Sequence, residues 1–190
     1  PKYAGNENTA YLVRLFSDLK RHDMGAGLAS PSPQGTIPAR MFLTRTLWGL
    51  AEISFLVLLI AGLGGYSLGS VAGGVQVFFS AVSWLVVFLM VGLAEEYVFR
   101  GYLLTTLSAG MGFWPASILL SLAFGAMHSG NPGENPVGLL TVSVVGMFFC
   151  LTVRRTGDLW FAVGAHAAHD FGQAFVYSVP NSGTVIRDPL

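Results

Sequence analysis

The stretch FLMVGLAEEYVFRGYLL, residues 88–104, places three charged side chains in a segment that is otherwise as apolar as lipid. Glu95, Glu96 and Arg100 interrupt a run that keeps a helical character from residue 75 to residue 107. Ionisable residues inside such runs are costly, usually face the interior of a helical bundle and mark function. The stretch therefore predicts a membrane helix that carries part of a functional site.

The composition of the whole chain agrees with a membrane location. Of the 190 residues, 53% are apolar and only 11% are charged, whereas a soluble domain carries about 25% charged residues. The formal net charge is zero, so nothing favours a nucleic acid as a partner. The single cysteine, Cys150, lies in an apolar run, which argues against a disulfide framework and predicts a buried thiol.

Five apolar segments separated by turn residues predict an all-α, polytopic membrane helical bundle of about five spans, with the lipid bilayer as its surroundings. We place the spans at residues 47–63, 75–107, 114–128, 137–153 and 159–179. The loops at 64–74 and 129–136 have no Lys or Arg. Basic residues gather instead before the first span and between the fourth and fifth: Arg14, Lys20, Arg21, Arg40, Arg45, Arg154 and Arg155. Five crossings put both basic regions on one side, which predicts a cytoplasmic N-terminus.

Three regions follow from this pattern. Residues 1–45 form a cytoplasmic N-terminal arm, residues 46–180 a transmembrane domain and residues 181–190 a polar tail. Within the arm, residues 9–21 have helical periodicity that fits either a helix on the membrane surface or a plain soluble helix. Residues 27–38 are a linker rich in Gly, Pro and Ser.

The ionisable residues within the spans lie at similar depths. At roughly 1.5 Å per residue, Glu95, His128 and Asp170 are each about 17–21 Å from the boundary that holds the basic regions, and His166 is somewhat shallower. Antiparallel neighbouring helices would therefore bring these groups to one layer. For all of them to be structural, several costly groups would have to converge without purpose.

Spacing within each helix predicts the partners. Glu96 and Arg100 are four residues apart, which suits an ion pair on one helix face. Glu95 points about 100° away from Glu96 and has no obvious partner on its own helix, which suits a general base. Phe124 and His128 share one face, as do His166 and Asp170.

Each feature also has a structural interpretation. The Glu96–Arg100 pair would stabilise helix packing even without catalysis, and His128 alone would serve as an interhelical hydrogen-bonding group. His169, three residues after His166, is interpreted as a supporting or structural residue. Glu52 stands alone near the start of a span and is interpreted as structural or interfacial.

Three motifs resemble those of a known family. EEYVFRG at 95–101 resembles the EExxxR motif of the CAAX-protease and bacteriocin-processing family, whose eukaryotic members are the type II CAAX prenyl endopeptidases. FGAMH at 124–128 is similar to its FxxxH motif, and HAAHDF at 166–171 to its third motif, a His followed four residues later by Asn or Asp. RRTGDLW at 154–160 is similar to the segment before that motif in bacterial members. The resemblance covers residues 80–177.

The resemblance implies an intramembrane endopeptidase in residues 46–180, in the cytoplasmic membrane of a bacterium. It implies that Glu95 is the catalytic carboxylate and works with His128 to activate a water molecule. Glu96 and Arg100 would hold the helix and tune the site. The substrate implied is a peptide or protein that enters from the membrane or from the cytoplasmic side.

The same resemblance implies that His166 and Asp170 stabilise the oxyanion. Many members have Asn where this chain has Asp170, and an ionised Asp would repel an oxyanion, so Asp170 would be protonated or would orient His166 instead.

Two alternatives stay open. A metal-free mechanism needs no cofactor, but a zinc protease would use His128, His166 and Glu95 as ligands. A protein without catalysis, such as a membrane scaffold, an immunity protein or a proton-linked carrier, would use the same polar layer for binding.

Overall fold

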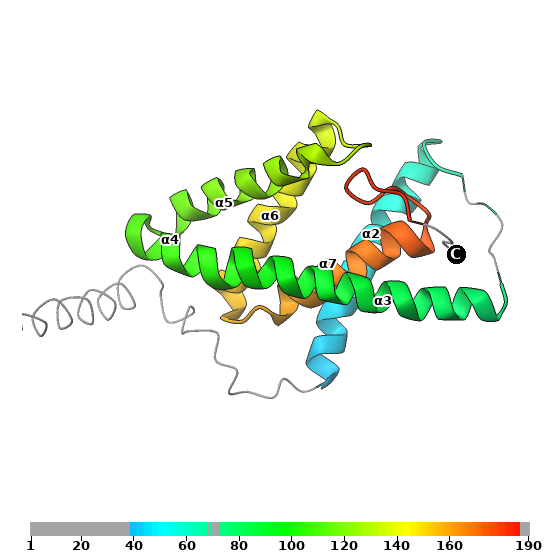
Figure 1. The fold of residues 1–190 in the computed structure, drawn as a ribbon, viewed down its shortest axis with the longest axis horizontal. Helices are drawn as coiled ribbons and strands as arrows, with labels where there is room; N and C mark the ends of the chain where they lie inside the picture. The colour runs from blue at the N-terminus through cyan, green and yellow to red at the C-terminus, as the bar shows by residue number, and fades with distance from the viewer. Residues whose placement is uncertain (1–38, 68, 70–72, 187–190) are drawn as a thin grey trace, which may run out of the picture.

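The computed structural model describes residues 39–67, 69 and 73–186 and is all-α, as predicted. Of the arm predicted for residues 1–45, residues 39–45 belong to a helix. Residues 1–38, with the predicted surface helix and linker, lie outside the described residues, so the cytoplasmic location of the arm stays a prediction. The helical elements are α2 (Ala39–Gly62), α3 (Val75–Glu96), η1 (Tyr97–Leu103), α4 (Leu104–Met111), α5 (Phe113–Met127), η2 (His128–Gly130), α6 (Pro136–Thr156), α7 (Trp160–Phe171) and η3 (Gly172–Val176). Figure 1 shows their arrangement.

The segments α3, η1 and α4 form one continuous helix of 37 residues, Val75–Met111, which is the long green helix of Figure 1. At 1.5 Å per residue it is about 55 Å long, well beyond the roughly 30 Å thickness of a hydrocarbon core. Gly112 ends it with a positive φ of 81°, a conformation that glycine adopts without strain. Pro115 then falls in the first turn of α5, where its missing N–H leaves no helix bond unmade.

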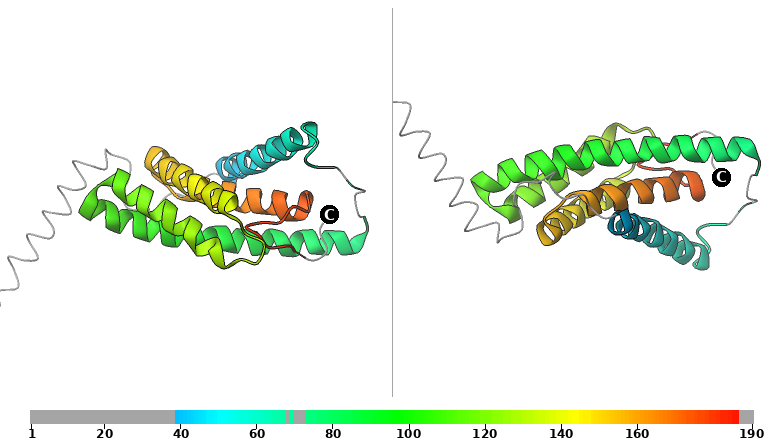
Figure 2. Two further views of the ribbon diagram at one scale, coloured as in Figure 1. Left: turned by 90° about the horizontal axis from the view of Figure 1, so that it is seen from above. Right: turned by 90° about the horizontal axis from the view of Figure 1, so that it is seen from below.

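Helix α7 occupies the centre of the bundle. It lies between α2 and the long helix in both views of Figure 2 and packs against α2, α3 and α6. Its small residues Ala162, Ala165 and Ala168 are buried, which lets the neighbouring backbones approach closely, as is common between membrane helices. Helix α5 packs against α4, the last part of the long helix, and against α6.

A hydrophobic core fills the space between the long helix, α5 and α6. It includes Phe99, Leu104, Phe113, Leu120 and Phe124. Cys150 belongs to this core and is a buried free thiol, as the sequence predicts.

Three helices of the described part are long and apolar enough to cross a membrane: Phe42–Gly62, Val75–Met111 and Pro136–Thr156. Helix α5, with 15 residues, and α7, with 12, are shorter. Large apolar side chains such as Phe55, Phe78 and Leu140 are exposed on the outer faces of the three long helices, as expected of surfaces that face lipid. These features indicate a multi-pass membrane protein, and the count of five spans stays a prediction.

The two basic regions of the described chain lie at the same end of the bundle. Nη1 of Arg45, near the start of α2, is 2.6 Å from Oδ1 of Asp158, which lies between α6 and α7. The Arg154 guanidinium lies 4.3 Å from the ring centre of Phe113, at the start of α5. This arrangement agrees with the prediction from the sequence that both basic regions lie on one side of the membrane. The side of the membrane on which this end lies stays a prediction.

The packing of α2 on α7 can be tested at Gly49. A Cβ atom at this position would overlap the main-chain carbonyl of Ala165, which cannot move without shifting α7. We expect Gly49→Ala to lower the free energy of unfolding by about 1–3 kcal/mol, measured by thermal unfolding in detergent. Gly62→Ala is the control, because nothing lies within 4 Å of the added methyl group. Equal stability of the two variants would contradict this packing.

Candidate active site

The charged stretch of the long helix lies where the helix widens. The π-helical segment η1 begins immediately after Glu96 and contains Arg100, and π-turns of this kind are frequent at functional sites. Glu96 and Arg100 are buried, with side chains 0% and 1% exposed, and Nη1 of Arg100 donates to Oε1 of Glu96 over 2.8 Å. The predicted ion pair is therefore present.

Aromatic rings surround the Arg100 guanidinium. Its central carbon is 4.3 Å from the ring centre of Phe124, and the rings of Phe149 and Phe99 lie at 5.5 and 5.7 Å. Contacts between a cation and a ring face contribute about 2 kcal/mol or more when both groups are desolvated. The rings and Glu96 together compensate the buried charge.

Glu96 has a second partner that the sequence does not predict. Nδ1 of His166 lies 2.8 Å from the same Oε1 atom that Arg100 contacts. Because an ionised carboxylate only accepts hydrogen bonds, Nδ1 of His166 carries a proton. The Phe149 ring stacks on the imidazole, with ring centres 5.5 Å apart and an interplanar angle of 23°. Glu96 and Phe149 thereby set the orientation of His166.

The other nitrogen of His166 faces two further carboxylates. Its Nε2 atom is 3.4 Å from Oδ2 of Asp170 and 3.8 Å from Oε2 of Glu95. The predicted proximity of His166 and Asp170 on one face of α7 is thus present. His166 stands among three carboxylates from two helices.

Glu95 is the least constrained carboxylate of this cluster. Its side chain is 30% exposed, and its Oε2 atom has no hydrogen-bond partner in the part of the chain that the structure describes. The side chains of His166, His128 and Asp170 lie near it. Glu95 is therefore held near several proton-transfer groups without being bound to one.

His128 lies at the end of α5, where η2 begins. Its Nδ1 atom is 2.7 Å from the main-chain oxygen of Phe124, one turn earlier. A carbonyl oxygen only accepts, so Nδ1 donates and Nε2 remains as the basic nitrogen. Phe124 also contacts His128 and His166 through its ring, at centroid distances of 5.0 and 6.3 Å. The spacing of Phe124 and His128 thus links them as predicted.

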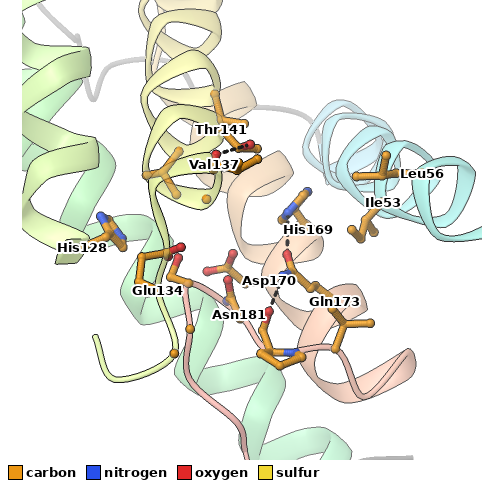
Figure 3. A pocket seen from close by; sticks show the side chains of 18 of the residues that line it. Ile53, Leu56, His128, Glu134, Val137, Thr141, His169, Asp170, Gln173 and Asn181 are labelled. Carbon is orange, nitrogen blue, oxygen red and sulfur yellow. Dashed lines mark hydrogen bonds between the residues drawn. The ribbon is translucent and has the colours of Figure 1, made fainter. Parts of the chain in front are cut away.

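A cavity of about 650 Å³ lies between α2, α6, α7 and the segments 133–135 and 179–183. His128, His166, His169 and Asp170 line it together with Glu134, and its other walls are largely apolar. Figure 3 shows several of these side chains around it. Among the described residues, neither Glu95 nor Glu96 lines the cavity, but both contact His166, which does.

A second series of hydrogen-bonded polar side chains, which was not predicted from the sequence, crosses the cavity wall. Oε2 of Glu52 is 2.7 Å from Nδ1 of His169, and Nε2 of His169 is 2.9 Å from Oε1 of Gln173. Gln173 then donates to the main-chain oxygen of Pro180 over 2.6 Å. Glu52 is therefore paired rather than isolated. The four-residue spacing of His169 and Gln173 is visible in the sequence, but the Glu52–His169 contact joins positions 117 residues apart.

The zinc alternative requires three ligands around one point. Within residues 39–67, 69 and 73–186, no group of three or more His, Cys, Asp or Glu side chains has the geometry to hold a metal ion. The set His128, His166 and Glu95 therefore does not form a zinc site in this arrangement.

Fold and site define a multi-pass membrane protein with a cluster of Glu, Arg, His and Asp side chains buried between its helices. The family model described as type II CAAX prenyl endopeptidase Rce1-like matches residues 77–172, just over half of the chain. The chain belongs to this family of peptide-bond hydrolases, which confirms the resemblance seen in its motifs. No curated protein and no solved structure gave a match in the same comparisons.

The matched segment contains the six residues predicted for the site and ends at Gly172, the first residue of η3. Helix α2, with Glu52, and the cavity-lining segment 179–183 lie outside it. Family membership implies an intramembrane protease with a protein or peptide substrate.

Proposed function

We propose that this chain is an intramembrane endopeptidase in which Glu95 and His128 activate a water molecule and His166 stabilises the oxyanion. The observation that carries the proposal is the position of His166. Glu96 holds its Nδ1 atom at 2.8 Å, so that Nε2 is presented toward Glu95 and Asp170. In this proposal His166 carries a proton on both nitrogens, which the three surrounding carboxylates favour. The imidazolium then presents Nε2–H as a hydrogen-bond donor beside a carboxylate that has no fixed partner.

In the proposed reaction, Glu95 takes a proton from a water molecule that also hydrogen-bonds to Nε2 of His128. The water oxygen bonds to the carbonyl carbon of the scissile peptide, and the negative charge that develops on the carbonyl oxygen is stabilised by an N–H of His166. Glu95 then passes the proton to the amide nitrogen as the C–N bond breaks. A water molecule is consumed, and a carboxyl and an amino group are formed.

Asp170 acts through His166 in this proposal. Its Oδ2 atom lies 3.4 Å from Nε2 of His166, which supports orientation of the imidazole rather than direct contact with the oxyanion. An ionised carboxylate in contact with the oxyanion would raise the energy of the transition state. The role of Asp170 is therefore positioning, together with compensation of charge on His166.

The proposal includes five membrane crossings with a cytoplasmic N-terminus, in a bacterial membrane. Helices α5 and α7 would be the two short crossings, supported by their positions within the bundle and by the basic residues gathered at one end. Stoichiometric zinc in a purified active sample would restore the zinc alternative, which no described cluster supports.

His128 provides the direct test. We expect His128→Ala to reduce kcat for cleavage by about 10²–10⁴-fold, because the water loses its second hydrogen-bond partner. Cleavage is measured by mass spectrometry on a mixed peptide library added to protein in liposomes. Ser129→Ala is the matched control, because Ser129 is the exposed neighbour and is not among the residues that line the cavity. Retention of cleavage by the His128 variant would overturn this assignment.

A further inference from the structure

Glu134 brings a carboxylate into the cavity that the proposed reaction does not use. Its Oε2 atom is buried and has no hydrogen-bond partner in the described part of the chain. Within the described residues, its Oε1 atom accepts only from the adjacent main-chain N–H of Asn135, at 3.0 Å. In the view of Figure 3, the Glu134 side chain points into the cavity from the segment that joins His128 to α6. A carboxylate in this position is partly desolvated without a compensating charge.

The other two acids that line the cavity have cationic or cation-forming partners. Glu52 contacts His169 at 2.7 Å, and Asp170 contacts His166 at 3.4 Å. No Lys or Arg occurs among the described residues that line the cavity. Glu134 is therefore the one acid of this described lining that lacks such a partner.

Helix capping does not account for Glu134. The N-terminus of α6 favours nearby negative charge, but the side chain of Asn135 already caps it by accepting from the N–H groups of Val137 and Gly138, at 3.0 and 3.1 Å. The first turn of α6 therefore has its side-chain acceptor without Glu134.

The backbone fixes the position of Glu134 relative to His128. The N–H of Asn131 donates to the oxygen of His128 over 3.0 Å, and the N–H of Glu134 donates to the oxygen of Asn131 over 3.1 Å. Gly138 leaves the space that the carboxylate occupies, because a Cβ atom there would overlap Oε1 of Glu134. Two consecutive turns and one glycine thus hold the carboxylate in the cavity that His128 lines.

We propose that Glu134 binds the side chain of a Lys or Arg residue of the substrate, so that the site selects peptides with a basic residue near the scissile bond. This inference rests on the proposed endopeptidase function. A cationic side chain gains a charge-assisted hydrogen bond from the unpartnered Oε2 atom. An acidic side chain or a free C-terminal carboxylate at the same place would be repelled by the Glu134 carboxylate. The described lining also offers no Lys or Arg to bind it.

The test uses peptides built on any sequence that the wild-type protein cleaves in liposomes. Lysine, norleucine or glutamate replaces the residue at each position near the scissile bond in turn, and kcat/KM is measured for each peptide. At one position we expect lysine to exceed norleucine by about 10–100-fold, the range of a charge-assisted hydrogen bond. Glu134→Gln should bring this ratio close to one, and Glu134→Lys should make the glutamate peptide the better substrate.

Gly138→Ala is the second variant, because it keeps the charge but displaces the carboxylate. We expect it to reduce the preference for lysine, and a methyl group in a helix does not itself disfavour folding. Arg155→Gln is the control, because it removes an exposed charge near the opposite end of α6. We expect the lysine preference of this control to equal that of the wild type.

The outcomes separate this inference from the proposed function. If the wild type cleaves lysine, norleucine and glutamate peptides equally, or if Glu134→Gln keeps the preference, the assignment of Glu134 is overturned while the endopeptidase remains. If the wild type cleaves no library peptide, or if Glu95→Ala cleaves as fast as the wild type, the proposed function fails and the inference fails with it.

Discussion

Glu95→Gln should strongly reduce peptide cleavage and leave the fold intact. Gln has the shape of Glu but cannot take a proton from water, so we expect kcat to fall by about 10²–10⁴-fold, the usual contribution of a general base. The fold should survive because the Glu95 side chain is 30% exposed and its Oε2 atom makes no hydrogen bond within the described residues. Cleavage of the peptide library and thermal unfolding in detergent measure the two effects separately.

This variant also separates an enzyme from a membrane scaffold or carrier. Membership in a family of peptide-bond hydrolases favours the enzyme, whereas a binding role would tolerate the loss of one charge with little change of shape. Activity of Glu95→Gln within a few-fold of the wild type would show that Glu95 is not the base. Glu52→Gln is a useful comparison, because it changes a carboxylate that pairs with His169 rather than with His166.

Arg100→Met should have the largest effect on stability. The Glu96 side chain is completely buried, and removal of Arg100 would leave its charge with His166 as its remaining hydrogen-bond partner. Breaking a buried ion pair in this way costs about 3–5 kcal/mol. Three ring contacts to the guanidinium would be lost as well. We expect a large fall in the thermal unfolding temperature and in the yield of folded protein.

The double variant Glu96→Gln with Arg100→Met tests whether the buried charge of Glu96 causes the loss of stability. It removes both charges, and a buried ion pair can often be replaced by neutral groups at little cost. We expect much of the lost stability to return. The glutamine side chain introduced at position 96 would still accept from Nδ1 of His166 but without the negative charge, so cleavage should stay below that of the wild type. If Arg100→Met is as stable as the wild type, the Glu96–Arg100 pair does not contribute to the stability of the fold as expected.

Local spacing was sufficient to predict the contacts within single helices. The Glu96–Arg100 pair, the proximity of His166 to Asp170 and the link from His128 to Phe124 all join residues four apart. Helical geometry brings such positions to one face regardless of what packs around them. Composition predicted an all-α membrane protein. The count of five crossings predicted that both basic regions share one end, which agrees with the contact between Arg45 and Asp158.

Contacts between helices could not be predicted in the same way. The bonds from Glu96 to His166 and from Glu52 to His169 join positions 70 and 117 residues apart, and they depend on how far each helix is rotated and shifted along its axis. The π-helical turns at Tyr97–Leu103 and Gly172–Val176 change that rotation just after Glu96 and Asp170. Nothing in the residue pattern indicates these turns.

The sequence by itself predicted which residues would carry the chemistry and at roughly which depth they would lie, because the cost of charge in lipid restricts such groups to places where they are used. Only the tertiary structure decided which partners each carboxylate has. It bonds Glu96 to both Arg100 and His166, leaves Glu95 without a hydrogen bond to Oε2 among the described residues, and turns Glu134 into the cavity. The physical reason is that the packing of whole helices decides which donor each carboxylate meets. Residue spacing along one helix does not determine that packing.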